Sequence, residues 1–159
     1  MACQLASTPT AGFAELSDFI GLSTGECHNA VRRLEMAGLL NPGSRRPVVE
    51  LLIRFLVHGV PHAFPAVIGP AAVGVPTAQS APVFKDLVVS DEAYVWPDVD
   101  GTARGLALLP LFPKAAMTVR RNRRLYEALA AIDALRVGQA RERKLAEELL
   151  RARLAGPAS

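Results

Sequence analysis

Apolar residues recur at helical spacing near the start of the chain, and a glycine interrupts the pattern. The first run consists of Phe13, Leu16, Phe19 and Ile20. Gly21 follows it and tolerates the left-handed conformation that ends many helices. Ser23 and Glu26 then have the spacing of a capping box, in which each side chain satisfies a free backbone amide. The pattern predicts two helices joined by a tight turn, with the second beginning at Thr24.

The second predicted helix has one apolar face and one polar face. Its apolar positions are Cys27, Ala30, Val31 and Leu34, and its opposite positions are Gly25, Asn29, Arg32 and Met36, flanked by His28 and Arg33. Gly38 indicates the end of the helix, and Leu39 and Leu40 then leave as extended chain. We therefore predict a helix-turn-helix over residues 13–40, packed on one side and free to bind on the other. The alternative is a helical hairpin that only packs.

The polar face carries side chains suited to contact with DNA bases. Asn can bond bidentately to adenine, Arg can bond to guanine, and His can donate or accept. The candidate base-contacting residues are Thr24, Gly25, His28, Asn29 and Arg32. Gly25 would let the start of the helix approach a phosphate closely.

The same residues carry a family resemblance. The pattern L-S-x-x-E-x-H-x-A-x-x-R-L-E-x-x-G-L-L spans residues 22–40. It resembles the recognition-helix region of bacterial winged-helix regulators of the broad MarR type. The match covers about an eighth of the chain. Its turn, helix cap, apolar stripe and terminating glycine all have the spacing of that family. The resemblance implies a transcriptional regulator whose recognition helix enters the major groove.

Two departures from that family are expected. Pro9 limits any helix before Phe13 to about two turns. After Leu40 the chain does not continue directly into a basic β-hairpin wing. Residues 41–43 instead predict a turn, and SRRPVVELLIRFLVHG predicts a helix with Ser44 as its cap, Pro47 in its first turn and Gly59 as its end.

The first possible wing comes later, in the run AFPAVIGPAAVGVPTA, as a hairpin around Gly69 and Pro70. It contains no Lys or Arg, so it cannot grip phosphate by charge. Strand packing or a dimer contact is the expected use. A second hairpin is predicted where residues 94–96 and 106–109 flank the turn at residues 97–101. Asp98 and Asp100 resemble the start of a calcium loop, but the remaining ligands are missing. Trp96 is expected in the core or at a subunit interface.

The last third predicts two helices, over residues 115–137 and 139–154, separated by Gly138. The second has an apolar stripe of Leu145, Leu149, Leu150 and Leu154. Two uses of this stripe stay open. It packs on the parent domain, or it forms the contact of a homodimer that binds two half-sites.

Charge is distributed unevenly. The chain has 159 residues, a net charge of +3 and an isoelectric point near 9.2. Charges cancel over residues 1–60, and the positive excess lies in the last forty or so residues. Arg120, Arg121, Arg123 and Arg124 cluster near a predicted helix start, where they oppose the helix dipole and suggest a nearby anion such as DNA phosphate. The alternative is a solvated surface turn. The full set of candidate phosphate contacts is Ser23, Arg33, Arg45, Arg46, Arg120, Arg121, Arg123 and Arg124.

Other chemistries are not expected. Cys3 and Cys27 do not form a disulfide framework, which favours a reduced, cytoplasmic protein. Gly59 and Pro61 lie between His58 and His62 and disrupt the helical geometry that a pair of zinc ligands would need, which disfavours a zinc site. No catalytic motif, cofactor site or metal site stands out, so we expect a non-enzyme. The longest apolar stretch is too short and interrupted to span a membrane.

These observations predict an α+β fold, mainly α, with three parts. Residues 1–60 form a winged-helix-like helix-turn-helix core, residues 61–113 a small β-hairpin region, and residues 114–159 a C-terminal helical extension. The predicted function is a homodimeric, sequence-specific regulator of transcription, more specifically a repressor, bound to double-stranded DNA. The alternative is a protein-interaction module, such as an antitoxin-like or adaptor protein, on the same scaffold.

Overall fold

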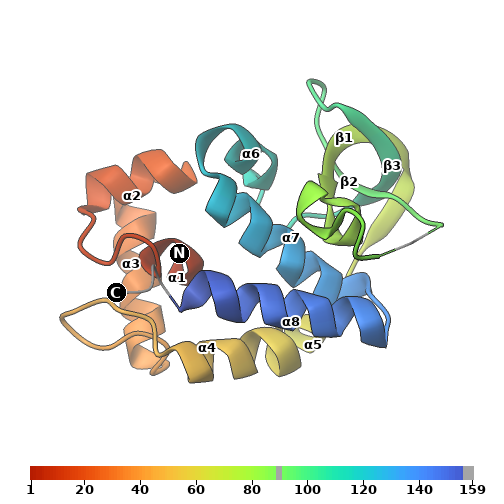
Figure 1. Ribbon diagram of the computed structural model, residues 1–159. Coiled ribbons are helices and arrows are strands. Elements are labelled where there is room, and N and C mark those ends of the chain that lie inside the picture. The colour runs from red at the N-terminus through yellow and green to blue at the C-terminus, as the bar shows by residue number, and fades with distance from the viewer. Residues whose placement is uncertain (89–90, 156–159) are drawn as a thin grey trace.

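The protein is an α+β molecule in which a bundle of helices carries a small sheet at one end (Figure 1). The computed structural model describes residues 1–88 and 91–155, so the last four residues of the predicted C-terminal part lie outside the described range. The helix-turn-helix lies at one end and the sheet at the other, with α7 (Arg123–Val137) running between them. Within the described residues, no helix is both long and apolar enough to cross a membrane.

The predicted helix-turn-helix is present at the expected residues. A single-turn helix α1 (Ala2–Leu5) precedes α2 (Phe13–Ile20) and α3 (Thr24–Met36). Gly21 has a φ of 78° and ends α2, and Gly38 has a φ of 69° just after α3. The capping box between Ser23 and Glu26 is formed in both directions. These local signals agree with the packing, because Cys27 and Val31 are buried on the inner face of α3.

The chain after Leu40 differs from the prediction. Residues 41–46 form the loop of a very short antiparallel hairpin, in which Leu40 pairs with Pro47. The Asn41 amide donates to the Arg46 carbonyl at 2.9 Å, and the Val48 amide donates to the Leu39 carbonyl at 3.0 Å. The predicted helix cap at Ser44 is therefore wrong. Pairing between the two ends of this loop, Leu40 and Pro47, outweighs the local helix signal. Proline is tolerated in this bridge because it has no backbone amide to donate. We call residues 41–46 the hairpin loop.

The helix that follows begins and ends later than predicted. It begins as α4 (Val49–Arg54), continues as a π-helical turn at Phe55–Gly59 and ends as α5 (Val60–Ala63). Gly59 does not end it. A Cβ atom there would lie 2.9 Å from the Phe55 ring, so glycine leaves room for that ring inside the π turn. Leu52, Ile53 and Leu56 are buried, whereas Leu51 and Phe55, which the apolar pattern also places in the core, are 45% and 40% exposed.

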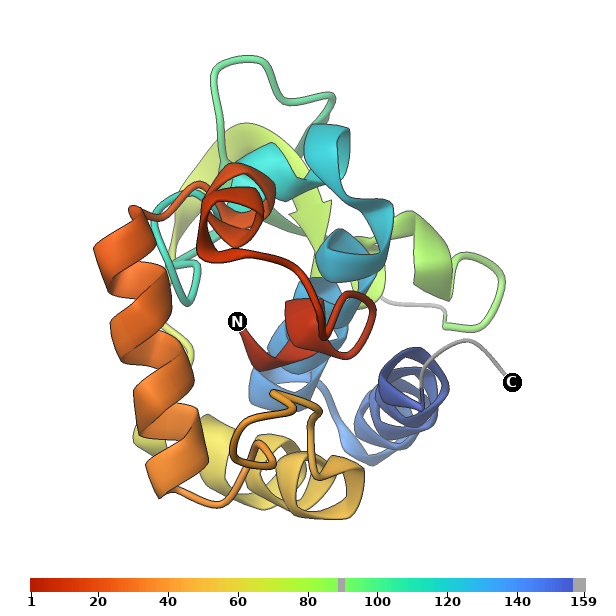
Figure 2. The same cartoon turned by 90° about the vertical axis from the view of Figure 1, so that its left-hand side faces the viewer.

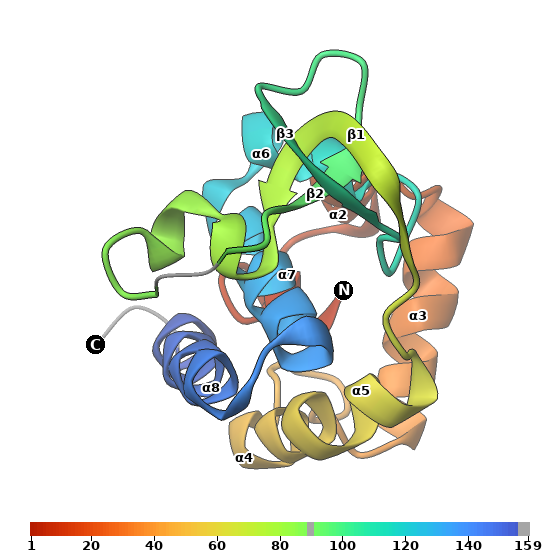
Figure 3. The ribbon, with the colours of Figure 1, turned by 90° about the vertical axis from the view of Figure 1, so that its right-hand side faces the viewer.

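The sheet consists of three strands that close on themselves (Figure 3). The long strand β1 (Ile68–Thr77) pairs antiparallel with both β2 (Tyr94–Pro97) and β3 (Ala103–Leu108), and these two pair in parallel with each other. Short 3-10 turns at Ala78–Ser80 and Pro82–Phe84 follow β1. Both predicted hairpins are wrong: Gly69 and Pro70 lie within one continuous strand, and β2 and β3, although present as strands, pair in parallel and not as an antiparallel hairpin.

A close approach at Gly74 explains this topology. Gly74 pairs with Pro97 on one side and with Ala103 on the other. A Cβ atom at Gly74 would collide with the Trp96 carbonyl, and one at Gly101 would collide with Gly74 itself. The predicted turn at residues 97–101 exists, with the Gly101 amide donating to Asp98 at 3.0 Å, but it crosses over β1. Only glycine allows backbones this close.

The C-terminal part contains a break that the sequence pattern did not predict. A 3-10 turn at Ala115–Met117 leads into α6 (Thr118–Arg121), and Asn122 then starts α7 as its N-cap by accepting from the Leu125 amide at 3.0 Å. Gly138 separates α7 from α8 (Ala140–Leu154), as predicted. A capping side chain in extended backbone conformation ends one helix and begins the next.

The leucine stripe of α8 packs on its own chain. Leu150 and Leu154 are 0% and 2% exposed, and Leu145 and Leu149 pack against the same core. Of the two uses left open, the structure has the intramolecular one. The prediction of a dimer contact through these four leucines is therefore corrected, because their side chains already have partners.

Two hydrophobic clusters divide the molecule differently from the predicted domains. The smaller belongs to the helix-turn-helix and contains Leu5, Ala11, Leu16, Cys27, Val31 and Leu40. The larger joins α4, the sheet, α7 and α8. Residues 49–60, expected with the first part, thus share a core with the C-terminal helices.

A buried polar group ties the sheet to α7. Asp133 is 1% exposed and accepts hydrogen bonds from Thr77 at 2.8 Å and from the Trp96 indole at 2.7 Å. Arg136 pairs with Asp133 at 2.7 Å and donates to the Phe64 carbonyl. Burial raises the pKa of Asp133, while the hydrogen bonds from Thr77, Arg136 and Trp96 oppose this. Trp96 is thus a core residue, one of the two predicted places.

Candidate nucleic-acid interface

The predicted base-contacting residues lie together on the outer face of α3. Thr24, Gly25, His28, Asn29 and Arg32 are all exposed. Among the described residues, the side chains of Asn29 and Arg32 have no hydrogen-bond or ion-pair partner. Figure 2 shows α3 along one edge of the molecule, with α2 and the hairpin loop nearby. This face therefore presents amide, imidazole and guanidinium groups to solvent.

A hollow of about 450 Å³ lies between the outer face of α3, the start of α2 and the hairpin loop. Its lining residues are Phe13, His28, Val31, Arg32, Glu35, Gly43 and Arg45. The hollow is therefore lined both by the outer face of α3 and by the basic hairpin loop, two segments that are separate in the sequence.

Phe13 holds two of these polar groups in place. Its ring centroid lies 5.1 Å from that of His28, and the guanidinium carbon of Arg45 lies 5.2 Å from the same ring. The second geometry is that of a cation–π contact. Arg45 has a φ of 54°, a conformation uncommon for residues other than glycine. The contact with Phe13 fixes the guanidinium beside α3 rather than leaving it free in solvent.

The hairpin loop is also fixed by hydrogen bonds. The Gly43 amide donates to Oε1 of Glu35 at 3.4 Å, and the side chain of Asn41 donates to the Arg46 carbonyl at 3.3 Å. Glu35 is the acidic member of the hollow, and this bond directs its carboxylate to the loop backbone. The loop thereby carries Arg45 and Arg46 at a set distance from α3.

Ser23 does not have the predicted phosphate-binding role. Its hydroxyl donates to Oε2 of Glu26 at 2.6 Å and accepts from the Glu26 amide at 3.2 Å, so its donor is already used. The hydroxyl and amide of Ser23 lower the pKa of Glu26, whose carboxylate stays charged at the start of α3. A negative charge there repels phosphate, so the helix start itself is a poor phosphate site.

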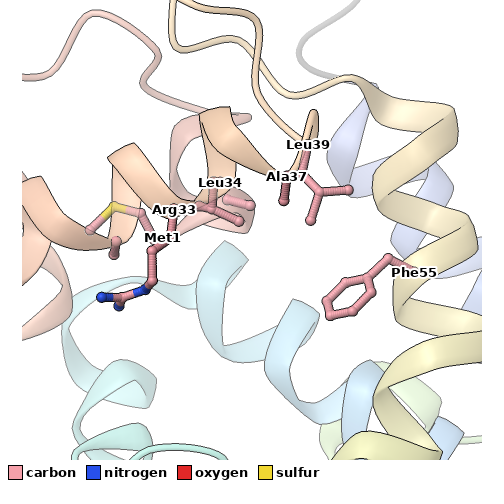
Figure 4. Close-up of a pocket in the computed structure, with 8 residues that line it drawn as sticks. Met1, Arg33, Leu34, Ala37, Leu39 and Phe55 are labelled. Carbon is pink, nitrogen blue, oxygen red and sulfur yellow. The ribbon is translucent and has the colours of Figure 1, made fainter.

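Arg33 lies on a different side of α3 from Arg32. It lines an open pocket of about 480 Å³ together with Met1, Ala2, Ala30, Leu34, Ala37, Leu39 and Phe55. Figure 4 shows Phe55 extending from the π turn toward Leu39 and Ala37, with Arg33 and Met1 farther along α3. Arg33 is exposed but does not share the hollow that contains Arg32 and Arg45. The structure does not bring it together with the other predicted contacts.

Three of the four clustered arginines have partners within the chain. Arg120 lies 3.6 Å from Asp100, and Arg123 pairs with Glu127 at 2.9 Å. Arg121 donates to the Asp18 carbonyl at the end of α2, at 3.2 Å. Arg124 is exposed and has no polar partner within the described ranges. The expected block of free cations is thus largely paired within the chain by surface contacts, in which the Arg120 and Arg123 side chains stay 66% and 83% exposed.

Sequence analysis missed the role of Phe13, which was counted only as an apolar position of α2. Two adjacent arginines after a turn were a signal for a basic hairpin tip. The helix pattern that begins at Ser44 concealed it. Lys114 was also missed, and its contact with Gly21 could not be inferred from residues so far apart.

The arrangement can bind an anionic, grooved partner. Its exposed groups donate hydrogen bonds and its loop carries positive charge, whereas no group of three or more His, Cys, Asp or Glu side chains in the described ranges could hold a metal ion. Both cysteines are free thiols. No family model, curated protein or solved structure matches this chain.

Proposed function

We propose that the protein binds double-stranded DNA in a sequence-dependent way and acts as a regulator of transcription, as a binding protein rather than an enzyme. The outer face of α3 would enter the major groove, where Asn29 and Arg32 contact base edges and His28 assists. Arg45 and Arg46 in the hairpin loop would contact the adjacent phosphates. Arg124 is the remaining candidate from the C-terminal cluster.

One observation carries this proposal: Arg32 of α3 and Arg45 of the hairpin loop line the same hollow. A helix that reads bases and a basic loop that holds the backbone must lie side by side on one surface. The short hairpin takes the place of the wing that the resemblance to MarR-type regulators implies. Its two arginines supply charge that the neutral balance of residues 1–60 hides.

Selection of bound sequences from random duplex DNA tests the proposal. We expect enrichment of a short motif, and a palindromic motif would indicate two chains per site. An unenriched pool, with duplex binding equally absent at low salt, would overturn the proposal.

Salt dependence measures the contribution of the loop. Anisotropy of a labelled duplex at about 50 mM and 200 mM salt gives the number of neutralised phosphates, at about 0.9 in log–log slope for each contact. The two loop arginines predict a slope near two from this surface, and a phosphate contact by Arg124 would raise it to near three.

A different surface supports the second candidate function, a protein-interaction module. Residues 63–84 contain no charged side chain, and one end of the sheet exposes Phe64, Val67, Ile68 and Leu109 to 53%, 56%, 48% and 59%. Clustered exposed apolar groups are typical of protein contacts. Absence of duplex binding at low salt, with Phe64→Ser leaving the fold intact and abolishing capture of a partner, would favour this function.

A further inference from the structure

The end of α2 is held by two cations from a distant part of the chain. Lys114 donates from Nζ to the Gly21 carbonyl at 2.5 Å, and Arg121 donates from Nη1 to the Asp18 carbonyl at 3.2 Å. The last carbonyls of a helix have no partner within it, and the helix dipole places negative charge there. Both donors therefore satisfy groups that would otherwise need water.

Lys114 also packs along the turn between α2 and α3. A Cβ atom added at Gly21 would lie 3.2 Å from Cδ of Lys114, so the lysine stem covers the glycine. Gly21 has a φ of 78° and decides where the chain turns toward Ser23, the cap of α3. Anything that restrains the Gly21 carbonyl restrains the angle between the two helices.

A third polar contact extends this seam to α1. The Asn122 side chain donates from Nδ2 to Oε1 of Gln4 at 2.6 Å, and its Oδ1 caps α7 by accepting from the Leu125 amide. Gln4 is only 2% exposed. We call Lys114, Arg121 and Asn122 the clamp. All three come from the short segment that carries α6, directly before α7.

The clamp joins two separately packed bodies. The helix-turn-helix has its own hydrophobic cluster beside the larger one that contains α7 and α8, and Leu34 of α3 packs against both. Between the two lies an apolar cavity of about 290 Å³, so the contact there is incompletely packed. A loosely packed junction restrains orientation weakly, which leaves directional hydrogen bonds to do so.

We propose that Lys114 and Arg121 are positioning residues for DNA binding, which hold the turn between α2 and α3 and so preorganise α3 for the groove. This inference rests on the proposed function. It replaces the expected role of Arg121 as a phosphate contact: Arg121 acts through the Asp18 carbonyl and not through the DNA. Lys114, which the sequence did not single out, has the same role at Gly21.

The substitution Lys114→Met tests the inference, because it keeps an apolar stem and removes the ammonium group. Lys144→Met, at an exposed lysine of α8, makes the same charge change as a control. We expect faster amide hydrogen exchange at the end of α2 and in the first turn of α3, with exchange in the sheet unchanged. Lys114→Arg restores a donor and should restore protection. Unchanged exchange at α2 in Lys114→Met would overturn the clamp.

Duplex binding gives a second measurement that separates positioning from direct contact. With the duplex enriched by selection, Lys114→Met and Arg121→Gln should each bind about fivefold more weakly, as expected for the loss of one exposed hydrogen bond. The slope against salt should stay at the wild-type value. A slope lower by about one would make the residue a phosphate contact and overturn the positioning role.

Duplex binding and hydrogen exchange test the proposed function and the clamp independently. If the wild-type protein binds no duplex, the proposed function fails, while hydrogen exchange still decides whether the clamp holds the turn. If the wild-type protein binds and neither variant changes affinity or exchange, the proposed function stands and the clamp is wrong.

Discussion

Arg32 and Arg45 carry equal charge in different surroundings, and we propose different roles for them. Arg32 projects from α3 with no polar partner among the described residues. Arg45 is half-buried, and its guanidinium lies over the Phe13 ring. A side chain on a recognition helix can reach base edges, whereas a cation on a loop beside that helix reaches the backbone. A base contact by Arg32 would affect sequence specificity, whereas a phosphate contact by Arg45 would affect binding to all sequences.

Arg32→Ala should lose discrimination at one operator position and weaken specific binding by about 1 to 3 kcal/mol. Arg45→Ala should weaken binding to every sequence alike and lower the salt slope by about one. Anisotropy with the selected and a scrambled duplex measures both, with Arg104→Ala on β3 as the matched control. Equal losses on both duplexes from both variants would contradict the assigned roles.

A substitution at Gly25 distinguishes an effect on DNA binding from an effect on folding stability. A Cβ atom added there would meet no atom within 4 Å, and its φ lies outside the left-handed region. Gly25→Ala should therefore raise the free energy of unfolding, by about 0.5 kcal/mol or more. If the start of α3 approaches DNA closely, the same variant should bind duplex more weakly. Denaturant unfolding and anisotropy on one sample compare the two effects, and tighter binding would contradict the close approach.

At the scale of elements, α3 is the best-specified helix of the chain. Its capping box, its apolar stripe and the glycine after it act at the same boundaries. The hairpin loop is specified differently, since its conformation depends on pairing between Leu40 and Pro47 and on the Gly43 bond to Glu35. The first element follows from its own residues, and the second follows from contacts across the chain.

The capping box predicts a dependence of stability on pH. Hydrogen bonds from Ser23 lower the pKa of Glu26 in the folded state below that in the unfolded state. Its contribution to the free energy of unfolding is therefore present above the ordinary pKa of about 4.3 and is lost as pH falls through the folded-state value. Glu26→Gln should remove this pH-dependent part.

Denaturant unfolding of both proteins from about pH 7 to pH 3 measures the effect. The gap in stability between wild type and Glu26→Gln should narrow as the pH falls. Glu15→Gln, at an exposed acid of α2, is the control. A gap that widens toward low pH would contradict the capping role.

At the scale of the whole molecule, α7 connects the two bodies. Ten of its own residues are buried, Asp133 and Tyr126 contact the sheet, and the helix packs along α8. The clamp lies directly before it, so the helix that organises the large core also sets the attachment of the helix-turn-helix. A change in the large core can thereby reach α3 through one short segment.

The leucine stripe of α8 makes a prediction at this scale. Because Leu150 is fully buried within its own chain, Leu150→Ala should lower the free energy of unfolding by about 2 to 5 kcal/mol. It should leave the molar mass in solution unchanged. Denaturant unfolding and light scattering check the two parts, and Ala152→Ser at an exposed α8 position is the control. Dissociation of a dimer by Leu150→Ala would contradict the intramolecular assignment.

The sequence predicted best where the signals were local. The bounds of α2 and α3, the cap at Ser23, the end at Gly38, the break at Gly138 and the turn near Asp98 all depend on residues within one or two turns. The exposed face of α3 followed from helical periodicity alone. Predictions failed where pairing between segments decided: Pro47 pairs with Leu40, and β2 and β3 flank Gly74. The cap at Asn122 is a local signal that the helical pattern of the neighbouring residues concealed.

The sequence by itself determined that this protein contains a helix-turn-helix with a polar outer face bearing Asn29 and Arg32, because caps and periodic apolar positions act within a few residues. The tertiary structure alone decided that Arg45 lies beside that face, that Arg121 and Lys114 hold the turn, and that the α8 leucines are internal. These outcomes depend on which surfaces meet. Contacts between residues a hundred positions apart leave no periodic trace in the sequence, so only the folded chain brings them together.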